Sequence, residues 1–312
     1  MKILVTGGAG FIGSHVVEAY LAAGHEVVVL DDLSTGKREN LNPKARFTHG
    51  SILDAAAADL IRRERPDVVN HHAAQISVRR SVDDPQLDAR INILGTVALL
   101  DAAREAGVRR FVFVSSGGAV YGEQETYPAP ETHQTWPVSP YGVSKRSGEL
   151  YCHFFQAEYG LPFVAFRYAN VYGPRQDPHG EAGVVAIFSG KMLRNETVTV
   201  NGDGKQTRDY VFVGDVARMS LRALEADATG PVNIGTGIET DVNVLAETLR
   251  DVAGSRSEIQ HGPAKGGEQR RSVIDARRAR EVFGWQPEVP LRDGLARTVE
   301  FFRARQGGAR SG

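Results

Sequence analysis

The sequence predicts an α/β fold, a doubly wound parallel sheet with helices on both faces and a smaller C-terminal α/β lobe. In the first half of the chain, short runs of β-branched residues alternate with longer amphipathic segments, which is the pattern of βαβ units. A glycine-rich turn follows the first of these runs directly. After residue 173 the pattern changes to loops, short helices and short strands, which indicates a second lobe.

The strands of the large sheet are expected where apolar residues run together, as is typical of parallel strands covered on both faces. These runs are residues 2–6, 26–30, 67–70, 111–115 and 162–168. Helical spacing of apolar residues predicts helices at 15–23, 55–65, 86–106 and 141–159. We expect residues 1–172 to form the first domain and 173–306 mainly the second lobe, with strands at 197–200 and 231–235. Residues 307–312 are expected to be a disordered tail.

Composition argues against several classes of protein. The 312 residues include 37 Lys and Arg against 38 Asp and Glu, and a net charge of −1 gives no basic surface for nucleic acid or an anionic membrane. The single cysteine, Cys152, permits neither an internal disulfide nor a thiolate metal cluster. No apolar run approaches the ~20 residues of a membrane span, and glycines interrupt the apolar N-terminal stretch too early for a signal peptide. We therefore expect a soluble cytoplasmic protein without a metal.

The turn after the first strand reads TGGAGFIG and places Gly7, Gly10 and Gly13 in G-x-x-G-x-x-G spacing before a helix. Glycines there allow a tight turn, close approach of the backbone to a pyrophosphate, and close packing of the helix on the strand. The start of the helix, at Phe11 and Ile12, adds amide donors and a partial positive charge. Because the turn lies between a strand and a helix, it predicts the dinucleotide site of a Rossmann fold.

Two acids end the second strand. Asp31 lies 18 residues beyond Gly13, close to where an acid hydrogen-bonds the adenosine ribose of NAD and repels the 2′-phosphate of NADP. The alternative is that Asp31 and Asp32 only open a turn, and Lys37 and Arg38 leave NADP binding open. We expect NAD.

The segment SPYGVSK places Tyr141 and Lys145 four residues apart, on one face of a helix that Pro140 can start. A phenol with an ordinary pKa of about 10 is a poor base near neutrality. A neighbouring ammonium together with an oxidised nicotinamide would lower the pKa of Tyr141, and Lys145 would also hold the nicotinamide ribose. The alternative is a surface contact between an aromatic ring and an aliphatic chain, for which this spacing is common.

Four motifs together, TGGAGFIG, the strand-end serine, YGVSK and RYANVYGP, resemble the extended short-chain dehydrogenase/reductase family, of the NAD-dependent sugar-nucleotide epimerase/dehydratase type. The resemblance covers nearly the whole chain and is greatest to the UDP-glucose 4-epimerases. It implies that Tyr141 is the base, that Lys145 activates it, and that a strand-end hydroxyl hydrogen-bonds the sugar 4-oxygen. It also implies a homodimer, formed through a four-helix bundle of the 86–106 and 141–159 segments.

The resemblance assigns further residues to the two ligands. Asn92 would support the active-site helix, while the backbone of NHHAAQ would line the cofactor loop, with a buried, hydrogen-bonded imidazole as the alternative for His71. Asn170 would contact the phosphate of the nucleotide sugar. Arg208 would bind the diphosphate, unless it pairs with Asp209 or Asp215. The expected cofactor residues are Gly7, Gly10, Phe11, Ile12, Gly13, Asp31, Asp32, Ser51, Ile52, His71, Ala73, Ala74, Asn92, Tyr141, Lys145 and Tyr168. The expected substrate residues are Ser116, Tyr141, Asn170, Arg208, Lys265, Glu268 and Ser272.

Two positions depart from the family pattern. Lys265-Gly-Gly-Glu268 stands where the family often has Arg-Pro-Gly-Asp, so one diphosphate contact loses the guanidinium fork. Ser51 stands in the adenine-side loop where an Asp is common. Whether Asp54, three residues further on, takes the place of that Asp stays open at this point.

The stretch SSGGAVYG bears on the reaction. Dehydratases of this family carry an Asp-Glu pair just after the strand end, whereas Gly117, Gly118 and Ala119 stand there in this chain and cannot move a proton. What remains is inversion at C4 through a 4-keto sugar that rotates in the space left by small residues, with NAD retained. Counting from the strand makes Ser116 the catalytic hydroxyl, and counting back from Tyr121 makes it Gly117. Since glycine cannot donate a hydrogen bond, we expect Ser116.

Other functions stay open at this point. The same family includes UDP-glucuronate 4-epimerases and decarboxylases, and a one-way reductase would share the site. A protein of another class, a non-catalytic NAD-binding regulator, would keep the fold without the chemistry. The small Ser272, at a position thought to exclude N-acetylated sugars when it is bulky, predicts that UDP-glucose and UDP-N-acetylglucosamine are both substrates.

Overall fold

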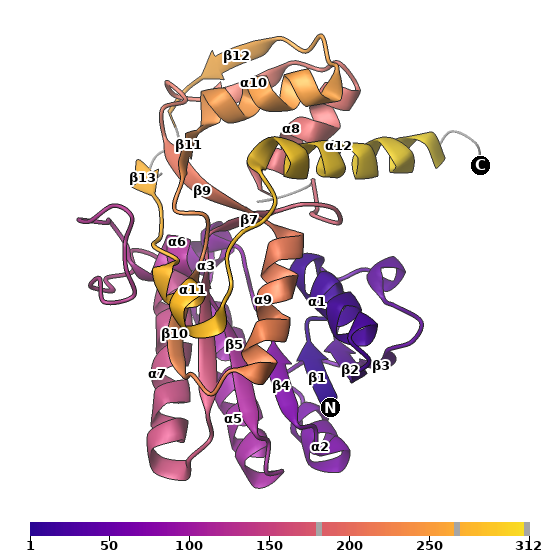
Figure 1. The fold of residues 1–312 in the computed structure, drawn as a ribbon, viewed down its shortest axis with the longest axis vertical. Helices are drawn as coiled ribbons and strands as arrows, with labels where there is room; N and C mark the ends of the chain where they lie inside the picture. The colour runs from indigo at the N-terminus through magenta and orange to yellow at the C-terminus, as the bar shows by residue number, and fades with distance from the viewer. Residues whose placement is uncertain (179–182, 265–268, 309–312) are drawn as a thin grey trace.

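The computed structural model describes residues 1–178, 183–264 and 269–308, and consists of a large parallel sheet with a second lobe beyond its carboxyl edge (Figure 1). The sheet has seven parallel strands in the order β10-β6-β5-β4-β1-β2-β3. Their bounds are β1 Lys2–Thr6, β2 Glu26–Asp31, β3 Arg46–His49, β4 Val68–His71, β5 Arg110–Ser116, β6 Phe163–Tyr168 and β10 Gly230–Ile234.

The strand order explains where a site can form. Strand β1 lies between β2 and β4, so the chain leaves it toward one side of the sheet and later returns to its other side. In open α/β sheets the crevice at the carboxyl ends of such neighbouring strands binds the ligand. The ends of β1, β2, β4 and β5 therefore meet at the expected cofactor site.

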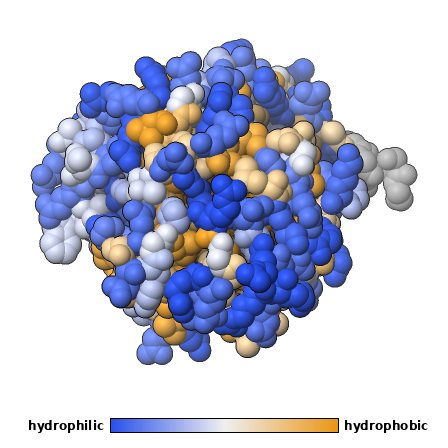
Figure 2. Space-filling model, turned by 60° about the horizontal axis from the view of Figure 1, so that its bottom comes forward, coloured by the Kyte–Doolittle hydropathy of each residue, from blue (hydrophilic) through white to orange (hydrophobic). Residues whose placement is uncertain are grey.

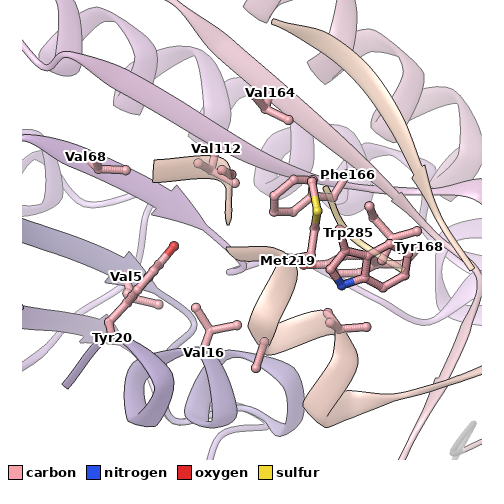
Figure 3. Packing of buried hydrophobic residues seen from close by; sticks show 14 of the residues in the cluster. Val5, Val16, Tyr20, Val68, Val112, Val164, Phe166, Tyr168, Met219 and Trp285 are labelled. Atoms are coloured by element: carbon pink, nitrogen blue, oxygen red, sulfur yellow. The ribbon is translucent and has the colours of Figure 1, made fainter. Parts of the chain in front are cut away.

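Helices cover both faces of the sheet, as predicted. On one face α1 packs against α9, and their apolar residues join Phe166, Tyr168 and Trp285 in one buried cluster (Figure 3). On the other face α2 packs on α5 and α5 on α7, over a second cluster. The helices that accompany the large sheet, on either face or at its carboxyl edge, are α1 Phe11–Ala22, α2 Ala55–Glu64, α3 Val78–Asp83, α4 Pro85–Ala89, the π-helical turn η2 Arg90–Gly95, α5 Thr96–Glu105, α6 Gly117–Val120, α7 Pro140–Tyr159, α9 Val213–Glu225 and α11 Arg277–Phe283. A short 3₁₀ turn, η1, lies at Arg38–Asn40.

The second lobe contains short strands and three helices around their own core. Strand β9 pairs with β7, β11 and β13, while β8 pairs with β12. The bounds are β7 Asn170–Tyr172, β8 Val198–Asn201, β9 Thr207–Phe212, β11 Glu239–Asp241, β12 Ile259–Gly262 and β13 Arg271–Ser272, with α8 Val184–Leu193, α10 Val242–Ala253 and α12 Leu291–Gly308.

Several elements differ from the sequence prediction. Strand β3 is missing from the prediction because its four residues are only partly buried or exposed at the sheet edge. The expected helix 86–106 is divided into α4, η2 and α5. Strand β10 and helix α9 come from the segment expected to be mainly second lobe, yet they belong to the large sheet and its cover. Helix α12 continues to Gly308, into the expected tail, and residues 309–312 lie outside the described residues.

The surface turned toward the viewer in Figure 2 is mostly hydrophilic, with apolar side chains in scattered areas. None of the helices in the described ranges has the length and apolarity that crossing a membrane requires.

Candidate active site

The glycine turn lies against the loop that follows β4. Gly7 has a φ of +70°, and a Cβ atom added there would lie 2.6 Å from the backbone nitrogen of Ala73. A Cβ at Gly13 would overlap the carbonyl oxygen of Gly7. Only glycine meets both demands, one on backbone conformation and one on space. The turn therefore brings the start of α1 beside Ala73 and Ala74, as the sequence predicts.

The start of α1 fits a pyrophosphate. Gly10 occupies the N-cap and offers no side chain to the first-turn amides, which have no partner inside the helix. A Cβ at Gly10 would meet only the Gly7 carbonyl within 4 Å, so the backbone can be approached from outside. The amides of Phe11 and Ile12 are thus suited to bind an anion, and these residues would hold the diphosphate of NAD.

Asp31 and Asp32 both bind backbone amides in the structure. Asp31 accepts hydrogen bonds from Ala9 N at 2.9 Å and Leu33 N at 2.8 Å, and Asp32 accepts one from Ser34 N at 2.9 Å. Burial raises the pKa of Asp31, against the effect of the two amides. The turn-opening role weighed from sequence is therefore present, and Asp31 also ties the glycine turn to β2.

His71 is a buried structural imidazole. Its Nδ1 lies 2.7 Å from Thr6 Oγ1 and its Nε2 lies 3.0 Å from Thr96 Oγ1, so both ring nitrogens are satisfied. Burial lowers the pKa of His71 well below its ordinary value and lowers that of His72 to about 3, with Lys145 contributing to both. Neither ring is charged near neutrality, and His71, with both ring nitrogens satisfied, leaves only its backbone for a cofactor.

Three other expected cofactor residues have structural side-chain roles. The Ser51 hydroxyl accepts a hydrogen bond from the Leu53 amide at 3.3 Å, and the Ile52 side chain is buried against Gly95. Tyr168 was expected near the cofactor, but its ring lies in the core with Phe166 and Trp285, because strand alternation directs it toward α9 (Figure 3). The side chain of Tyr168 therefore does not face the site.

Ser116, Tyr141 and Lys145 come together at the end of β5. Ser116, at the end of β5, lies near enough to the Tyr141 phenol to lower its pKa. The Lys145 ammonium donates to Val114 O at 2.9 Å and lies 5.8 Å from the centre of the Tyr141 ring. Pro140 at the first helical position and Ser139 at the N-cap start α7 one residue before Tyr141, which places both side chains on the face toward β5.

Burial dominates the titration of this pair. Burial raises the pKa of Tyr141 to about 12; Asp88 raises it further, and the nearby Ser116 lowers it. Burial lowers the pKa of Lys145 to about 8, against the opposing effect of Asp88. The Lys145 ammonium, 5.8 Å from the centre of the ring, and the oxidised nicotinamide would both favour the phenolate and so act against this rise in the pKa of Tyr141.

The two adjacent serines of SSGGAVYG have different partners. Ser115 Oγ donates to Glu149 Oε1 at 2.6 Å, and Glu149 pairs with the buried Arg167 at 2.7 Å. Ser116 faces Tyr141, so the structure places the hydroxyl where counting from the strand puts it. A Cβ at Gly117 would lie 2.9 Å from the Ile274 side chain. Gly117 thus accommodates protein packing and not, as expected, the rotating sugar.

The catalytic helix α7 is held by Asn92, as predicted, and also by Asp88 and Ser81, which were not predicted. Asn92 donates to Ser144 Oγ at 3.2 Å and to Asp88 Oδ1 at 3.0 Å, which supports α7 as predicted for Asn92. Ser81 Oγ accepts the backbone amide of Tyr141 at 3.1 Å. The available signal was the helical spacing of Asp88 and Asn92, four residues apart.

The second lobe contributes the opposite wall. Arg208 on β9 pairs in register with Ser272 on β13, and a Cβ at Gly118 would lie 3.9 Å from Ser272 Oγ. The competing partners considered for Arg208 are engaged elsewhere: Asp209 by Thr236 and Gly237, and Asp215 by Arg218, Glu288 and Val289. Asn170 is exposed at the start of β7. The predicted contacts of Lys265 and Glu268 lie outside the described residues.

Within the described part of the chain, no three His, Cys, Asp or Glu side chains gather as metal ligands would. The groups that the described residues bring to the site include backbone amides, hydroxyls, an ammonium and a guanidinium. Such a set suits a dinucleotide and a nucleotide sugar.

Comparisons with known proteins agree with this geometry. Residues 3–235 match the model of the NAD dependent epimerase/dehydratase family. The UDP-glucose 4-epimerase of Mycolicibacterium smegmatis is 50% identical over 97% of this chain and 99% of its own. The structure of a UDP-glucose 4-epimerase from Thermotoga maritima with UDP-glucose has a TM-score of 0.96 at 50% identity, covering 98% of this chain and 100% of that one. That of the Thermus thermophilus enzyme with NAD has 0.92 at 46% identity, covering 97% and 99%. The chain belongs to the NAD-dependent epimerase/dehydratase family.

Proposed function

We propose that the protein is an epimerase that inverts C4 of a UDP-hexose, UDP-glucose and UDP-galactose first of all, and so serves galactose metabolism. The observation that carries the proposal is that Ser116, Tyr141 and Lys145 come together at the end of β5, where Ser116 is followed by three residues that cannot move a proton. Relatives that are 50% identical over nearly the whole chain carry the name UDP-glucose 4-epimerase, which supports the same reaction.

The residues divide the chemistry among them. When bound, NAD supplies the acceptor and donor of hydride for the sugar C4. Tyr141 accepts the proton of the 4-hydroxyl and later returns it, while Ser116 hydrogen-bonds the same oxygen. Lys145 places a positive charge beside the phenol. The 4-keto sugar would rotate between these steps, so that the hydride returns to the opposite face of C4 while Tyr141 returns the proton to the 4-oxygen, and no net oxidation results.

The second lobe is proposed to hold the UDP group. Arg208 carries the guanidinium that matches a diphosphate, and it is the register partner of Ser272 on the neighbouring strand. Asn170 lies at the start of the neighbouring strand β7 and is exposed toward solvent. The two residues are proposed as the phosphate contacts of the nucleotide sugar.

The proposal includes a homodimer located in the cytoplasm. Large apolar side chains are exposed along α7 at Val143, Leu150 and Phe154, and on the adjoining turn η2 at Leu94. They recur at helical spacing on one side of α7, which favours burial against a second copy of the chain. The cytoplasmic location is supported by the single cysteine.

The test begins with the purified protein. It is denatured, the released nucleotide is identified, and a panel of UDP-sugars is assayed for inversion at C4. Tyr141→Phe is expected to keep the nucleotide and to lower turnover by at least about 100-fold, the usual contribution of general acid–base catalysis. Unchanged turnover in Tyr141→Phe would contradict the mechanism. Net reduction of the nucleotide would indicate a one-way reductase, turnover of UDP-glucuronate alone the related epimerase or decarboxylase, and bound NAD without turnover a regulatory protein.

A further inference from the structure

A buried carboxylate lies next to the catalytic helix and accepts hydrogen bonds from neutral amides. Asp88 on α4 is 1% exposed, and α4 packs against α7. Its Oδ1 accepts hydrogen bonds from Gln75 Nε2 at 2.9 Å and Asn92 Nδ2 at 3.0 Å, both neutral amides. Neither amide carries a charge that would balance the carboxylate. A buried charge without a partner is strongly unfavourable, so this one requires an explanation.

Among the described charged and titratable groups around Asp88, Lys145 is the buried cation that can balance the charge of the carboxylate. His71 and His72, at the end of β4, are uncharged near neutrality because burial lowers the pKa of each. The basic residues of α3 and of η2 (Arg79, Arg80 and Arg90) are exposed to solvent, as are Asp83 and Asp84. Lys145 is 4% exposed and interacts electrostatically with Asp88, as Tyr141 does.

We propose that Asp88 is a positioning residue for the Tyr141–Lys145 pair, whose fixed negative charge keeps the Lys145 ammonium charged inside a site with little water. The proposal rests on the proposed function, since it assigns Asp88 a task only through the two residues that perform the chemistry. The same carboxylate has an opposite effect on the phenol, because a nearby anion disfavours the phenolate. Asp88 thus makes Tyr141 harder to ionise, and it keeps Lys145 positively charged over a wider pH range.

A purely structural role would also use the hydrogen bonds of Asp88. Through Asn92 the carboxylate is connected to Ser144 Oγ, and Ser144 donates to the Tyr141 carbonyl at 2.9 Å. Loss of these bonds would lower the rate equally at every pH. Loss of the charge would instead change the pKa values of Lys145 and Tyr141, and this difference makes the proposal testable.

Asp88→Asn removes the charge and keeps an acceptor oxygen of the same size. Without the anion, the ammonium is less favoured and the phenolate is more favoured, so the pKa values of Lys145 and Tyr141 both fall. The pKa of Lys145 is expected to fall by about one unit, the lower end of the effect of a nearby charge. The acid and alkaline limbs of the pH–rate profile are both expected to move to lower pH, because activity needs the phenolate and the ammonium.

The direct measurement is the Lys145 titration, followed by NMR of ¹³C-labelled lysine in the protein as isolated. The chain has only seven lysines, and Lys145→Met identifies the signal. Asp83→Asn, which removes an exposed charge at the end of α3, is the matched control and is expected to leave the titration unchanged. Asp88→Glu keeps the charge and is expected to titrate like the native protein even if its rate is lower.

The titration needs no substrate, so it separates this proposal from the proposed function. If Asp88→Asn lowers the Lys145 pKa but the native protein inverts no UDP-sugar, the charge role of Asp88 is supported and the proposed epimerase function is wrong. An unchanged Lys145 pKa in Asp88→Asn, with the rate reduced equally at every pH, would overturn the charge role of Asp88. If Asp88→Asn does not fold, Asp88→Ser replaces it as the neutral variant, and the same two outcomes decide.

Discussion

The large sheet and the second lobe contribute to the candidate active site in different ways. On the side of the large sheet, the site residues extend from long strands or from α7, and buried groups with several bonds hold them, among them Glu149, Arg167 and Asn92. On the side of the second lobe, they lie on short strands, and β13 has only two residues. The sheet side therefore has the rigidity that proton transfer requires, and the lobe side has the adaptability that substrate selection uses.

This contrast predicts two kinds of variant. Changes on the sheet side should lower the free energy of unfolding, because they leave buried polar groups without partners. Changes on the lobe side should alter which sugar is turned over and leave the free energy of unfolding almost unchanged.

The largest expected loss of stability comes from Glu149→Gln. Arg167 donates to both carboxylate oxygens of Glu149, at 2.9 and 2.7 Å, and both side chains are 2% exposed. Removing the carboxylate charge leaves a buried guanidinium unpaired, which costs about 3–5 kcal/mol. Urea unfolding at pH 7 measures the difference, and Glu158→Gln, on the exposed side of the same helix, is the control.

The pH dependence of that difference has a defined sign. Burial alone would raise the pKa of Glu149, but the hydrogen bonds from Arg167 hold it below its ordinary value. A carboxylate with a lowered pKa contributes stability that is complete above its unfolded pKa and is lost as the pH falls through the folded pKa. The native protein and Glu149→Gln should therefore converge in stability at acid pH. A constant difference down to that range would contradict the ion-pair explanation.

A smaller effect is expected where the two sides touch. Gly117→Ala would place a Cβ 2.9 Å from the Ile274 side chain and 3.3 Å from the Arg167 carbonyl, so it should lower the free energy of unfolding by about 1–3 kcal/mol. Gly118→Ala has only Ser272 Oγ nearby, at 3.9 Å, and should be neutral or stabilising by up to about 1 kcal/mol, since alanine favours the short helix α6. Equal losses in thermal or urea unfolding would refute the assignment of Gly117 to packing.

The same contrast explains how far the sequence could lead. The parallel strands and their helices were predictable because buried strands read as apolar runs and glycines mark the turn at Gly7 and Gly10. Tyr141 and Lys145 were predictable because four residues are one helical turn. The spacing alone did not decide between Ser116 and Gly117, since the choice depends on how the chain turns into α6; Ser116 was predicted because glycine has no hydroxyl. Strand β10 was predictable as a strand but not as a member of the large sheet, because pairing with β6 is a long-range contact.

Residues whose role depends on partners far away in the sequence escaped prediction. Asp88 and Ser81 have no motif of their own and become recognisable only when α3 and α4 are seen packed on α7. Tyr168 shows the reverse error, since its place in RYANVYGP suggested the cofactor while the alternation of β6 turns its ring into the core. A motif identifies which segment lies at the site, whereas the direction of each side chain is set by the pairing of the strand.

The finest test of the lobe side is Ser272→Tyr. Ser272 is 4% exposed and lies across from Gly118, so we expect a tyrosine there to reduce the room for an N-acetyl group. The ratio of kcat/KM for UDP-N-acetylglucosamine to that for UDP-glucose is expected to fall at least about tenfold, with little change in unfolding. Ser272→Ala removes the hydroxyl without adding volume and should keep both activities. A native protein that does not turn over the N-acetylated sugar, or a Ser272→Tyr variant that loses stability and both activities together, would show that β13 belongs to the rigid part of the site.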